Sequence, residues 1–472
     1  MDTLWNILNG IIDFITSAII PIAGAVITYR QVSEEAMEKK IRNFKMLGEQ
    51  SPTDRNSYAK KCVELYRRQY KKGLRGRKYE DMVFNNLIYM RNWLGWDERM
   101  NDFVSLDKVR VNLNFNTHAD DNEDHNNVYS KIVNDAWDKT PPKAKFLPYP
   151  KDGYALNLKY AADKNVNLYN GALFALENAS GDVKYCHTSD SVKAKYEEPF
   201  TLNVKIGGYF DFLNTCECLL NEVYSTCEIK HRAFPNALPN PKISFLSNLP
   251  CRAKVRDIFD FSNRFAGIGI NSATIFHNLL DENGEKKSYI LFHNRTKNVV
   301  EGRGAVHVVP AGSYQPIVGL DAENQASINT DMKNTVYSEF AQELLGKKEI
   351  TYLNVENYKQ DNKLNWDIQF LGIGIEPLNT KCEVLTSIII DMEKFDNRQF
   401  FGTNTLAGLT KFFKACEEGT LLIEELNRFT ITKYLNDPRM TPPGKEIMSI
   451  ILKHEDYFMK VSPEKNKEGV TV

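Results

Sequence analysis

Two acidic side chains in the segment DMKNTVYSEFAQELLGKKE, residues 331–349, could bind a metal ion. Glu339 and Glu343 are four positions apart, so they project from the same face of the amphipathic helix that this segment predicts. Carboxylates on one face can supply part of the octahedral shell of Mg²⁺, which phosphate oxygens and water complete. The alternative is an ordinary charged face, because exposed amphipathic helices often carry Glu at this spacing.

A turn that precedes this helix could deliver a ligand to the two carboxylates. The segment GAVHVVPAGSYQPIVG, residues 304–319, is typical of a strand that runs into a Pro/Gly turn. An arginine beside such a turn could pair with phosphate, and a tyrosine could stack on a base. A buried His on an apolar strand or a packed Tyr would be the structural alternative. The candidate ligand contacts are Arg303, His307, Gly312, Tyr314 and Gln315.

This order of strand, turn and acidic helix resembles a Nudix domain. In that family a Gly follows a strand, and a helix then reads Arg-Glu-apolar-x-Glu-Glu. Position by position, Glu339 matches the first Glu of this box, Phe340 the apolar position and Glu343 the last Glu. The segment Val309–Gly312 resembles the turn before the box. The resemblance implies that Glu339 and Glu343 are the metal ligands and catalytic carboxylates, with Mg²⁺ as the cofactor.

The box is degenerate at several positions. Ser338 stands where the family carries Arg, and Gln342 replaces an acid that helps to bind metal or activate water. Asn324 and Thr330 stand where Gly and Glu belong, and the link from Gly312 to the helix is longer than usual. Because Gln carries no negative charge and is a poor general base, metal affinity should fall and turnover should fall further.

The resemblance extends over roughly residues 150–460, in order and spacing more than in identity. LPCRAKVRDIFDFSNRFAGIGINSATI (249–275) and FLGIGIEPLNTKCEVLTSIIIDM (370–392) are similar to parts of the C-terminal Nudix-like module of certain bacterial regulators. The fold that this implies is α+β, a Nudix-like α/β/α sandwich with a mixed sheet. An N-terminal helical segment and an α+β extension would precede it.

The N-terminus is almost wholly apolar from Phe14 to Thr28, and basic residues follow it. The run can be extended back to Leu4, although Asn6, Asn9 and Asp13 weaken that extension. A run of about 20 apolar residues can cross a bilayer, and the basic flank predicts that the bulk of the chain lies in the cytoplasm. We therefore expect a single-pass protein of the inner membrane. A helix that lies in the membrane interface or packs on a partner copy is the second interpretation, and a soluble core helix is the third.

These segments predict five regions along the chain. A transmembrane or interfacial helix occupies residues 1–29, a helical basic linker 30–135, an α+β extension 136–240, the Nudix-like domain 241–460 and a disordered tail 461–472.

The linker region is expected to be helical and basic. YEDMVFNNLIYMRNWLGW, residues 79–96, has helical spacing with few breakers. The cluster at residues 66–81 could contact anionic lipid or nucleic acid, or could be a solvated helix end. HADDNEDHNN, residues 118–127, contains two His and four acids, but an exposed loop explains it better than a metal site.

Overall charge and cysteine usage limit the partners. Lys and Arg together number 60 against 61 Asp and Glu, so the net charge does not favour a polyanion. The eight cysteines form no pair of CxxC units, which indicates reduced thiols. A DNA-binding regulator acting through residues 57–80 is therefore the least favoured reading, and nucleic acid the least favoured partner.

Two functions remain open from the sequence. The first is a membrane-anchored, Nudix-like sensor or effector that recognises a nucleotide or cyclic oligonucleotide. It resembles the transmembrane–Nudix effectors of bacterial anti-phage nucleotide signalling. For such a protein we expect the N-terminus to bind membrane lipids and the chain to assemble as a homo-oligomer. The second is a Mg²⁺-dependent Nudix hydrolase that cleaves substrates linked through a nucleoside diphosphate. Its weakness is the pair Ser338 and Gln342.

Overall fold

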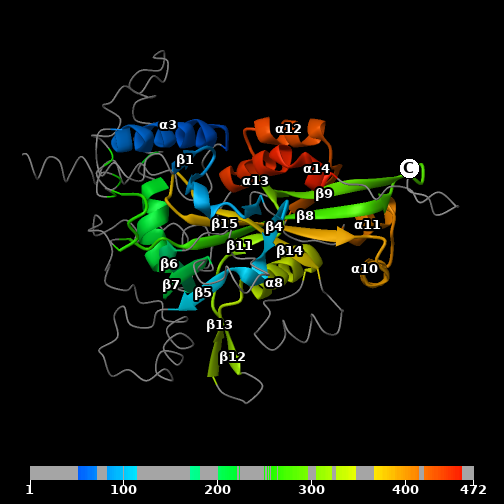
Figure 1. Cartoon of the computed structure of the whole chain (residues 1–472), viewed down its shortest axis with the longest axis horizontal. Helices are drawn as coiled ribbons and strands as arrows, with labels where there is room; N and C mark the ends of the chain where they lie inside the picture. Colours follow the sequence, from blue (N-terminus) through cyan, green and yellow to red (C-terminus); the bar gives the residue numbers. More distant parts are fainter. Residues whose placement is uncertain are drawn as a thin grey trace, which may run out of the picture.

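The computed structural model describes eight stretches of the chain and residue 223. The stretches are 52–71, 82–113, 171–180, 200–220, 249–295, 304–346, 366–413 and 419–459, with short gaps inside the second, fifth and sixth. The described part has a mixed α+β fold, in which a large twisted sheet lies between helices (Figure 1). The α+β class expected from the sequence is therefore confirmed.

A mixed sheet of eleven strands forms the centre. Its main path is β1-β2-β14-β15-β8-β9-β10, and β3, β4, β11 and β16 pair beside that path. Strand β15 pairs with β8 in parallel, whereas the other pairs in this sheet are antiparallel. The strands are β1 (Met82–Phe84), β2 (Ile88–Met90), β3 (Trp96–Asp97), β4 (Asp102–Ser105), β8 (Ile268–Leu280), β9 (Lys286–Arg295), β10 (Val306–Val308), β11 (Ala311–Ser313), β14 (Asp367–Ile375), β15 (Cys382–Asp391) and β16 (Gly419–Glu425).

The central strands are nearly continuous apolar runs because both faces of the sheet are covered. Almost every residue of β8, β14 and β15 is buried. The turn Asp281–Gly284 joins β8 to β9, and the Asp281 carboxylate accepts hydrogen bonds from the backbone N–H groups of Asn283 and Glu285. Gly284 has a φ of 81°, a conformation that favours glycine. The predicted hairpin is confirmed.

Helices cover both faces of the sheet (Figure 1), with α8 on one side and α12 and α13 on the other. The helices are α3 (Pro52–Lys71), α6 (Tyr209–Phe212), α8 (Met332–Leu345), α10 (Phe395–Phe401), α11 (Leu406–Phe413), α12 (Arg428–Asn436), α13 (Pro442–Lys453) and α14 (Glu455–Phe458). Short helical turns also occur at Arg91–Trp93, Leu106–Lys108 and, as a π-turn, Leu213–Glu217.

Two smaller β elements accompany the main sheet. β5 (Arg110–Leu113), β7 (Thr201–Gly208) and β6 (Ala172–Ser180) form a three-stranded sheet in that order. β12 (Ile317–Leu320) and β13 (Ala326–Asn329) form a hairpin that projects from the body (Figure 1). This hairpin lies between β11 and α8 in the chain and accounts for the long link that the sequence shows before the acidic helix.

The helix predicted over residues 79–96 is wrong. The structure has strands β1 and β2 there, followed by the short turn Arg91–Trp93, and Ile88 pairs with Ile375 of β14. The side chains of Asn85 and Asn86 donate hydrogen bonds to the buried Glu446 carboxylate of α13. These tertiary bonds favour a hairpin over the helix that the apolar spacing predicts.

The predicted inner-membrane location is also wrong. No helix in the part of the chain that the structure describes is long and apolar enough to cross a membrane. The longest of them, α3, has 20 residues and carries Lys and Arg along its length. The apolar run at residues 1–29, the acidic loop at 118–127 and the tail at 461–472 lie outside the described residues.

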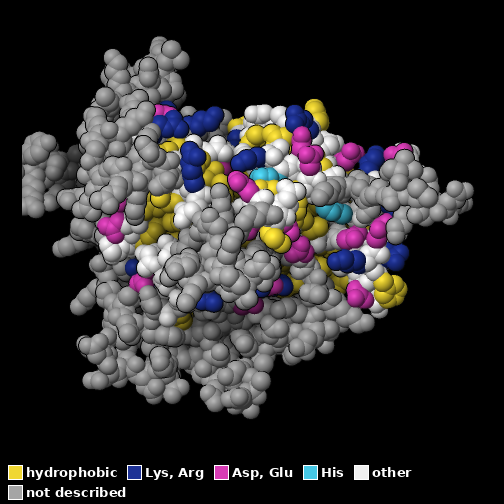
Figure 2. Space-filling model, viewed as in Figure 1, with side chains coloured by type: hydrophobic (Ala, Val, Ile, Leu, Met, Phe, Trp, Pro, Cys, Tyr) yellow, Lys and Arg dark blue, Asp and Glu magenta, His cyan; other side chains and the backbone are white. Residues whose placement is uncertain are grey.

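Side chains of both charge signs are mixed on the described face that Figure 2 shows. On the face shown in Figure 2, Lys and Arg side chains alternate with Asp and Glu, and neither sign forms an extended patch among the coloured residues. This distribution agrees with the near balance of charge in the sequence.

Candidate functional site

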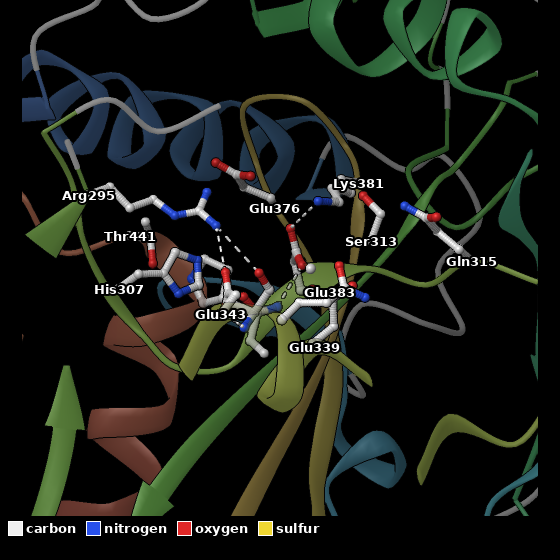
Figure 3. A pocket seen from close by; sticks show the side chains of 15 residues that line it. Arg295, His307, Ser313, Gln315, Glu339, Glu343, Glu376, Lys381, Glu383 and Thr441 are labelled. Carbon is white, nitrogen blue, oxygen red and sulfur yellow. Dashed lines mark hydrogen bonds and ion pairs between the residues drawn. The ribbon is translucent and has the colours of Figure 1, made fainter. Parts of the chain in front are cut away.

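A polar cavity of about 280 Å³ lies where the bend between β10 and β11 meets helix α8 (Figure 3). Residues of β8, the end of β9, the β14–β15 connection and the first turn of α13 complete its walls. In Figure 3, Arg295, His307 and Thr441 lie on one side, Ser313, Gln315 and Lys381 lie on the other, and the acidic side chains lie between them.

Five of the seven residues expected from the sequence line this cavity: Glu339, Glu343, His307, Gly312 and Gln315. The bend and the acidic helix, which are separate in the chain, therefore both contribute to one cavity.

The other two expected residues do not contribute to the described cavity. Tyr314 is fully buried, donates a hydrogen bond from its hydroxyl to the carbonyl of Thr330, and packs its ring 4.5 Å from that of Phe174. Burial raises the pKa of this hydroxyl well above its usual range. Tyr314 therefore has the structural role that was the alternative to base stacking. Arg303 lies outside the described residues.

Local sequence explains why α8 presents its acids to the cavity. Asp331 caps the helix, since its carboxylate accepts a hydrogen bond from the backbone N–H of Lys333 at 2.9 Å. Gly346 ends the helix in a left-handed conformation, with a φ of 61°. Between these caps, Glu339 and Glu343 fall on the face that meets the bend.

The bend itself is fixed on strand β8. The backbone N–H of Ser272 donates to the Pro310 carbonyl at 2.9 Å, and the hydroxyl of Thr274 donates to the Val309 carbonyl at 2.8 Å. Beyond the bend, β11 pairs with the start of β8. The backbone that faces α8 is therefore held by the central sheet.

Gly312 makes room for the carboxylate of Glu339. A Cβ atom at Gly312 would lie less than 3.0 Å from the carboxyl atoms of Glu339, a distance that real Cβ atoms essentially never show. The missing side chain thus forms a cradle in which a carboxylate packs directly on the backbone of β11. Any larger residue here would force the end of the flexible Glu339 side chain out of this position.

Glu343 is held by two contacts. One carboxylate oxygen accepts a hydrogen bond from the backbone N–H of Ala311 at 2.8 Å, and the other pairs with Arg295 at 3.1 Å. The same Arg295 nitrogen donates to the Ala311 carbonyl at 3.4 Å. Arg295, Glu343 and Ala311 together join the end of β9, helix α8 and the bend.

A second acidic wall comes from the start of β15 and from the connection that precedes it. Glu383 is buried, accepts a hydrogen bond from the side chain of Asn271 at 2.7 Å, and lies 3.8 Å from Lys381. Gly269 opposite leaves the space that the Glu383 carboxylate occupies. Glu376, at the start of the connection, is 1% exposed and also lines the cavity.

The sequence pattern missed Asn271 and four charged residues of the cavity, which are Arg295, Glu376, Lys381 and Glu383. A signal for three of them was present, because Asn271, Glu376 and Glu383 interrupt apolar runs that predict buried strands. Nothing in the local sequence indicates that Arg295 lies on Glu343.

His307 presents a hydrogen-bond acceptor to the cavity. Its Nδ1 lies 2.7 Å from the Val308 carbonyl, which can only accept, so Nδ1 carries the proton and Nε2 the lone pair. Burial, and next the positive charge of Arg295, lower the pKa of His307 well below its usual range. The ring is therefore neutral at neutral pH.

The cavity is acidic overall. Four carboxylates line it against the two cations Arg295 and Lys381, which leaves a formal excess of two negative charges. A bare anion would be repelled, whereas a divalent cation or a metal–phosphate complex would be attracted.

The donor set fits a metal ion that arrives with a ligand. Within the described residues, no group of three or more His, Cys, Asp or Glu side chains could hold a metal ion by itself. Mg²⁺, however, usually binds through one or two carboxylates plus substrate phosphates and water. Glu339 and Glu343, one turn apart beside the glycine cradle, provide that number of carboxylates.

The fold and the cavity define a mixed α+β protein with an acidic, glycine-lined cavity. No family model matches the sequence, and no curated protein matches it. Among solved structures, the chain is similar to a mutT/nudix family protein from Listeria innocua, with 12% sequence identity and a TM-score of 0.23. The likeness covers 40% of this chain and 94% of that chain. A TM-score this low carries no argument, so the proposals below rest on the chain's own residues.

Proposed function

We propose that this protein is a Nudix-like nucleotide-recognising module that binds a diphosphate-bearing ligand together with Mg²⁺. The observation that supports the proposal is the meeting of Glu339 and Glu343 with the Gly312 bend in one polar cavity. All residues that line the cavity fall between 271 and 443. They lie inside the range 241–460, which we propose as the ligand-binding domain.

Glu339 and Glu343 would hold the metal in this proposal. Mg²⁺, when bound, would offset the negative charge of the diphosphate and allow it to enter an acidic cavity. Lys381 and Arg295 are the cations available to phosphate oxygens, and His307 can accept a hydrogen bond from a ligand N–H or O–H group.

The contacts of Gln342 favour a protein that binds its nucleotide ligand over one that cleaves it. Its side-chain amide donates a hydrogen bond to the Ser338 hydroxyl at 2.9 Å, so the residue in place of the expected acid is engaged with its own helix. We therefore propose a nucleotide sensor of the kind used in bacterial signalling, anti-phage signalling included. Assembly as a homo-oligomer stays a prediction.

A binding experiment tests this function. Full-length protein is titrated by calorimetry with nucleoside diphosphate sugars, dinucleoside polyphosphates and cyclic oligonucleotides, each with Mg²⁺ and with EDTA. We expect Mg²⁺-dependent binding of at least one class, abolished by Glu339→Gln. If none of these classes binds in either condition, the proposed function is wrong.

Hydrolysis is the second candidate function, because both box carboxylates line the cavity beside a neutral His307. The same ligands are incubated with protein and Mg²⁺, and the products are separated by chromatography. We expect slow or no cleavage by the wild type and a gain in Gln342→Glu, whose new carboxylate can accept from the Ser338 hydroxyl. Rapid cleavage by the wild type, abolished by Glu343→Gln, would instead identify a hydrolase.

A further inference from the structure

Arg295 occupies the position where a divalent cation would neutralise Glu343. It is the last residue of β9, and its guanidinium lies 3.1 Å from the Glu343 carboxylate. The side chains are 17% and 6% exposed respectively, so water screens their charges only in part. In the structure, one positive charge thus already balances one of the acids of the cavity.

This pairing affects a metal ion and a phosphate differently. A divalent cation at Glu343 meets the positive charge of Arg295 at close range and is repelled by it. A free phosphate meets the four carboxylates that outnumber the two cations in the cavity. Each partner alone is therefore disfavoured by a charge that the other partner would balance.

The contacts of Glu343 allow Arg295 to change partners. Glu343 keeps a second contact, the 2.8 Å hydrogen bond from the Ala311 backbone, which does not involve the guanidinium. Its carboxylate therefore stays in place when Arg295 moves. A guanidinium suits phosphate as well as carboxylate, because its planar fork can form two parallel hydrogen bonds with either group.

We propose that Arg295 couples the two parts of the ligand, so that a divalent cation and a phosphate group bind to this cavity only together. Without ligand, Arg295 pairs with Glu343; with ligand, it pairs with phosphate while the metal takes its place beside Glu339 and Glu343. This inference rests on the proposed function and adds its regulation: the cavity discriminates against free metal and against free phosphate.

Three titrations of the full-length protein test the coupling: Mg²⁺ alone, inorganic diphosphate with EDTA, and the two combined. Affinities are corrected for the formation of the Mg²⁺–diphosphate complex in solution. For the wild type we expect binding in the combined titration and little in the other two. By linkage, each component should strengthen the other by the same factor.

The variant Arg295→Gln should change the affinity for Mg²⁺ alone and the affinity for diphosphate with Mg²⁺ in opposite directions. We expect Mg²⁺ alone to bind about tenfold more tightly than in the wild type, equivalent to ~1.4 kcal/mol, because the competing charge is gone. Diphosphate with Mg²⁺ should bind at least about tenfold more weakly. A general loss of folding cannot strengthen Mg²⁺ binding. Arg295→Lys keeps the charge but not the planar fork, so Mg²⁺ alone should still bind poorly.

Arg428→Gln is the matched control, since Arg428 pairs with Glu455 at 2.8 Å on α14, outside the cavity. It should leave all three titrations unchanged. If the wild type binds the combined ligands and Arg295→Gln leaves the affinity for Mg²⁺ alone and the coupling factor as in the wild type, the inference is overturned while the proposed function stands. If the wild type binds diphosphate under no condition, the proposed function fails together with the inference.

Discussion

Glu343 accepts a hydrogen bond from the backbone N–H of Ala311 at 2.8 Å, which ties the acidic helix α8 to the bend that faces it. The two residues are 32 positions apart in the chain. Between them lies the projecting hairpin of β12 and β13. The bond therefore fixes the distance across the cavity, whatever the position of the intervening hairpin, and gives Glu343 a structural role besides its proposed role toward the metal.

The dual role of Glu343 predicts that the two acids of α8 respond differently to the same substitution. Glu343→Gln presents an amide to Arg295 and removes the negative charge from a largely buried pair, so we expect a loss of about 2 kcal/mol in the free energy of unfolding. Glu339→Gln should cost less than about 1 kcal/mol but abolish Mg²⁺–diphosphate binding. Urea unfolding and calorimetry measure the two effects. Equal losses of stability would contradict the distinction.

Gly312 predicts a steric coupling with Glu339. In Gly312→Ala the new Cβ displaces the Glu339 carboxylate from its cradle, so ligand binding should be lost. Because the displaced atoms are the end of a flexible side chain, the free energy of unfolding should fall by less than about 1 kcal/mol. The control is Gly312→Ala made in a protein that already carries Glu339→Ala, because that substitution removes the atoms that clash. There Gly312→Ala should cost little, and a double-mutant cycle of unfolding free energies measures the difference. Additive effects would show that the cradle does not exist.

The local parts of the fold and site follow from the sequence because they depend on periodicity over short distances. Helix α8 was expected at residues 331–349 and forms at Met332–Leu345, since Gly346 ends it. Helix geometry alone places Glu339 and Glu343 on one face, and both line the cavity. The apolar runs of β8 and β15 likewise predict buried strands.

The parts that the sequence did not predict depend on contacts between distant segments. Arg295 meets Glu343 across 48 positions, and Asn271 meets Glu383 across 112. The hairpin of β1 and β2 forms although its own spacing is helical, because β2 pairs with β14 and the turn residues Asn85 and Asn86 donate hydrogen bonds to Glu446. Only the order of strands in the sheet brings these groups together, and local pattern does not specify that order.

The buried Arg252 links helix α3 to the β14–β15 connection, which forms one wall of the cavity. We therefore predict that α3 stabilises this wall. Arg252 is fully buried and donates hydrogen bonds at 2.7 Å to both the Tyr66 hydroxyl of α3 and the Pro377 carbonyl of the β14–β15 connection. Tyr66→Phe leaves this guanidinium with one acceptor fewer, at a cost of ~1–3 kcal/mol. Glu64→Gln, at an exposed pair on the same helix, should cost less than about 0.5 kcal/mol. Thermal or urea unfolding compares them, and similar costs would refute the supporting role of Arg252.

His307 predicts a dependence of stability on pH. Burial and Arg295 hold its pKa well below the usual range in the folded protein, whereas an unfolded histidine binds a proton near its ordinary value of about 6.5. Below that pH the unfolded state binds more protons than the folded state, so the stability linked to His307 is present above pH ~6.5 and declines as the pH falls. We expect the free energy of unfolding to decrease less between pH 7 and pH 5 in His307→Asn, which retains a donor toward the Val308 carbonyl, than in the wild type.

The control for this pH effect is His454→Asn. Burial lowers the pKa of His454 as well, with a smaller effect of Lys453, but this ring packs at a tilt against Trp96, outside the cavity. NMR titration of the imidazole C–H resonances assigns each effect to its residue. In Arg295→Gln the pKa of His307 should rise, because the neighbouring positive charge is removed, whereas that of His454 should stay the same. A His307 resonance that titrates near pH 6.5 in the wild-type protein would show that the ring is solvated and is not the neutral acceptor proposed for the ligand.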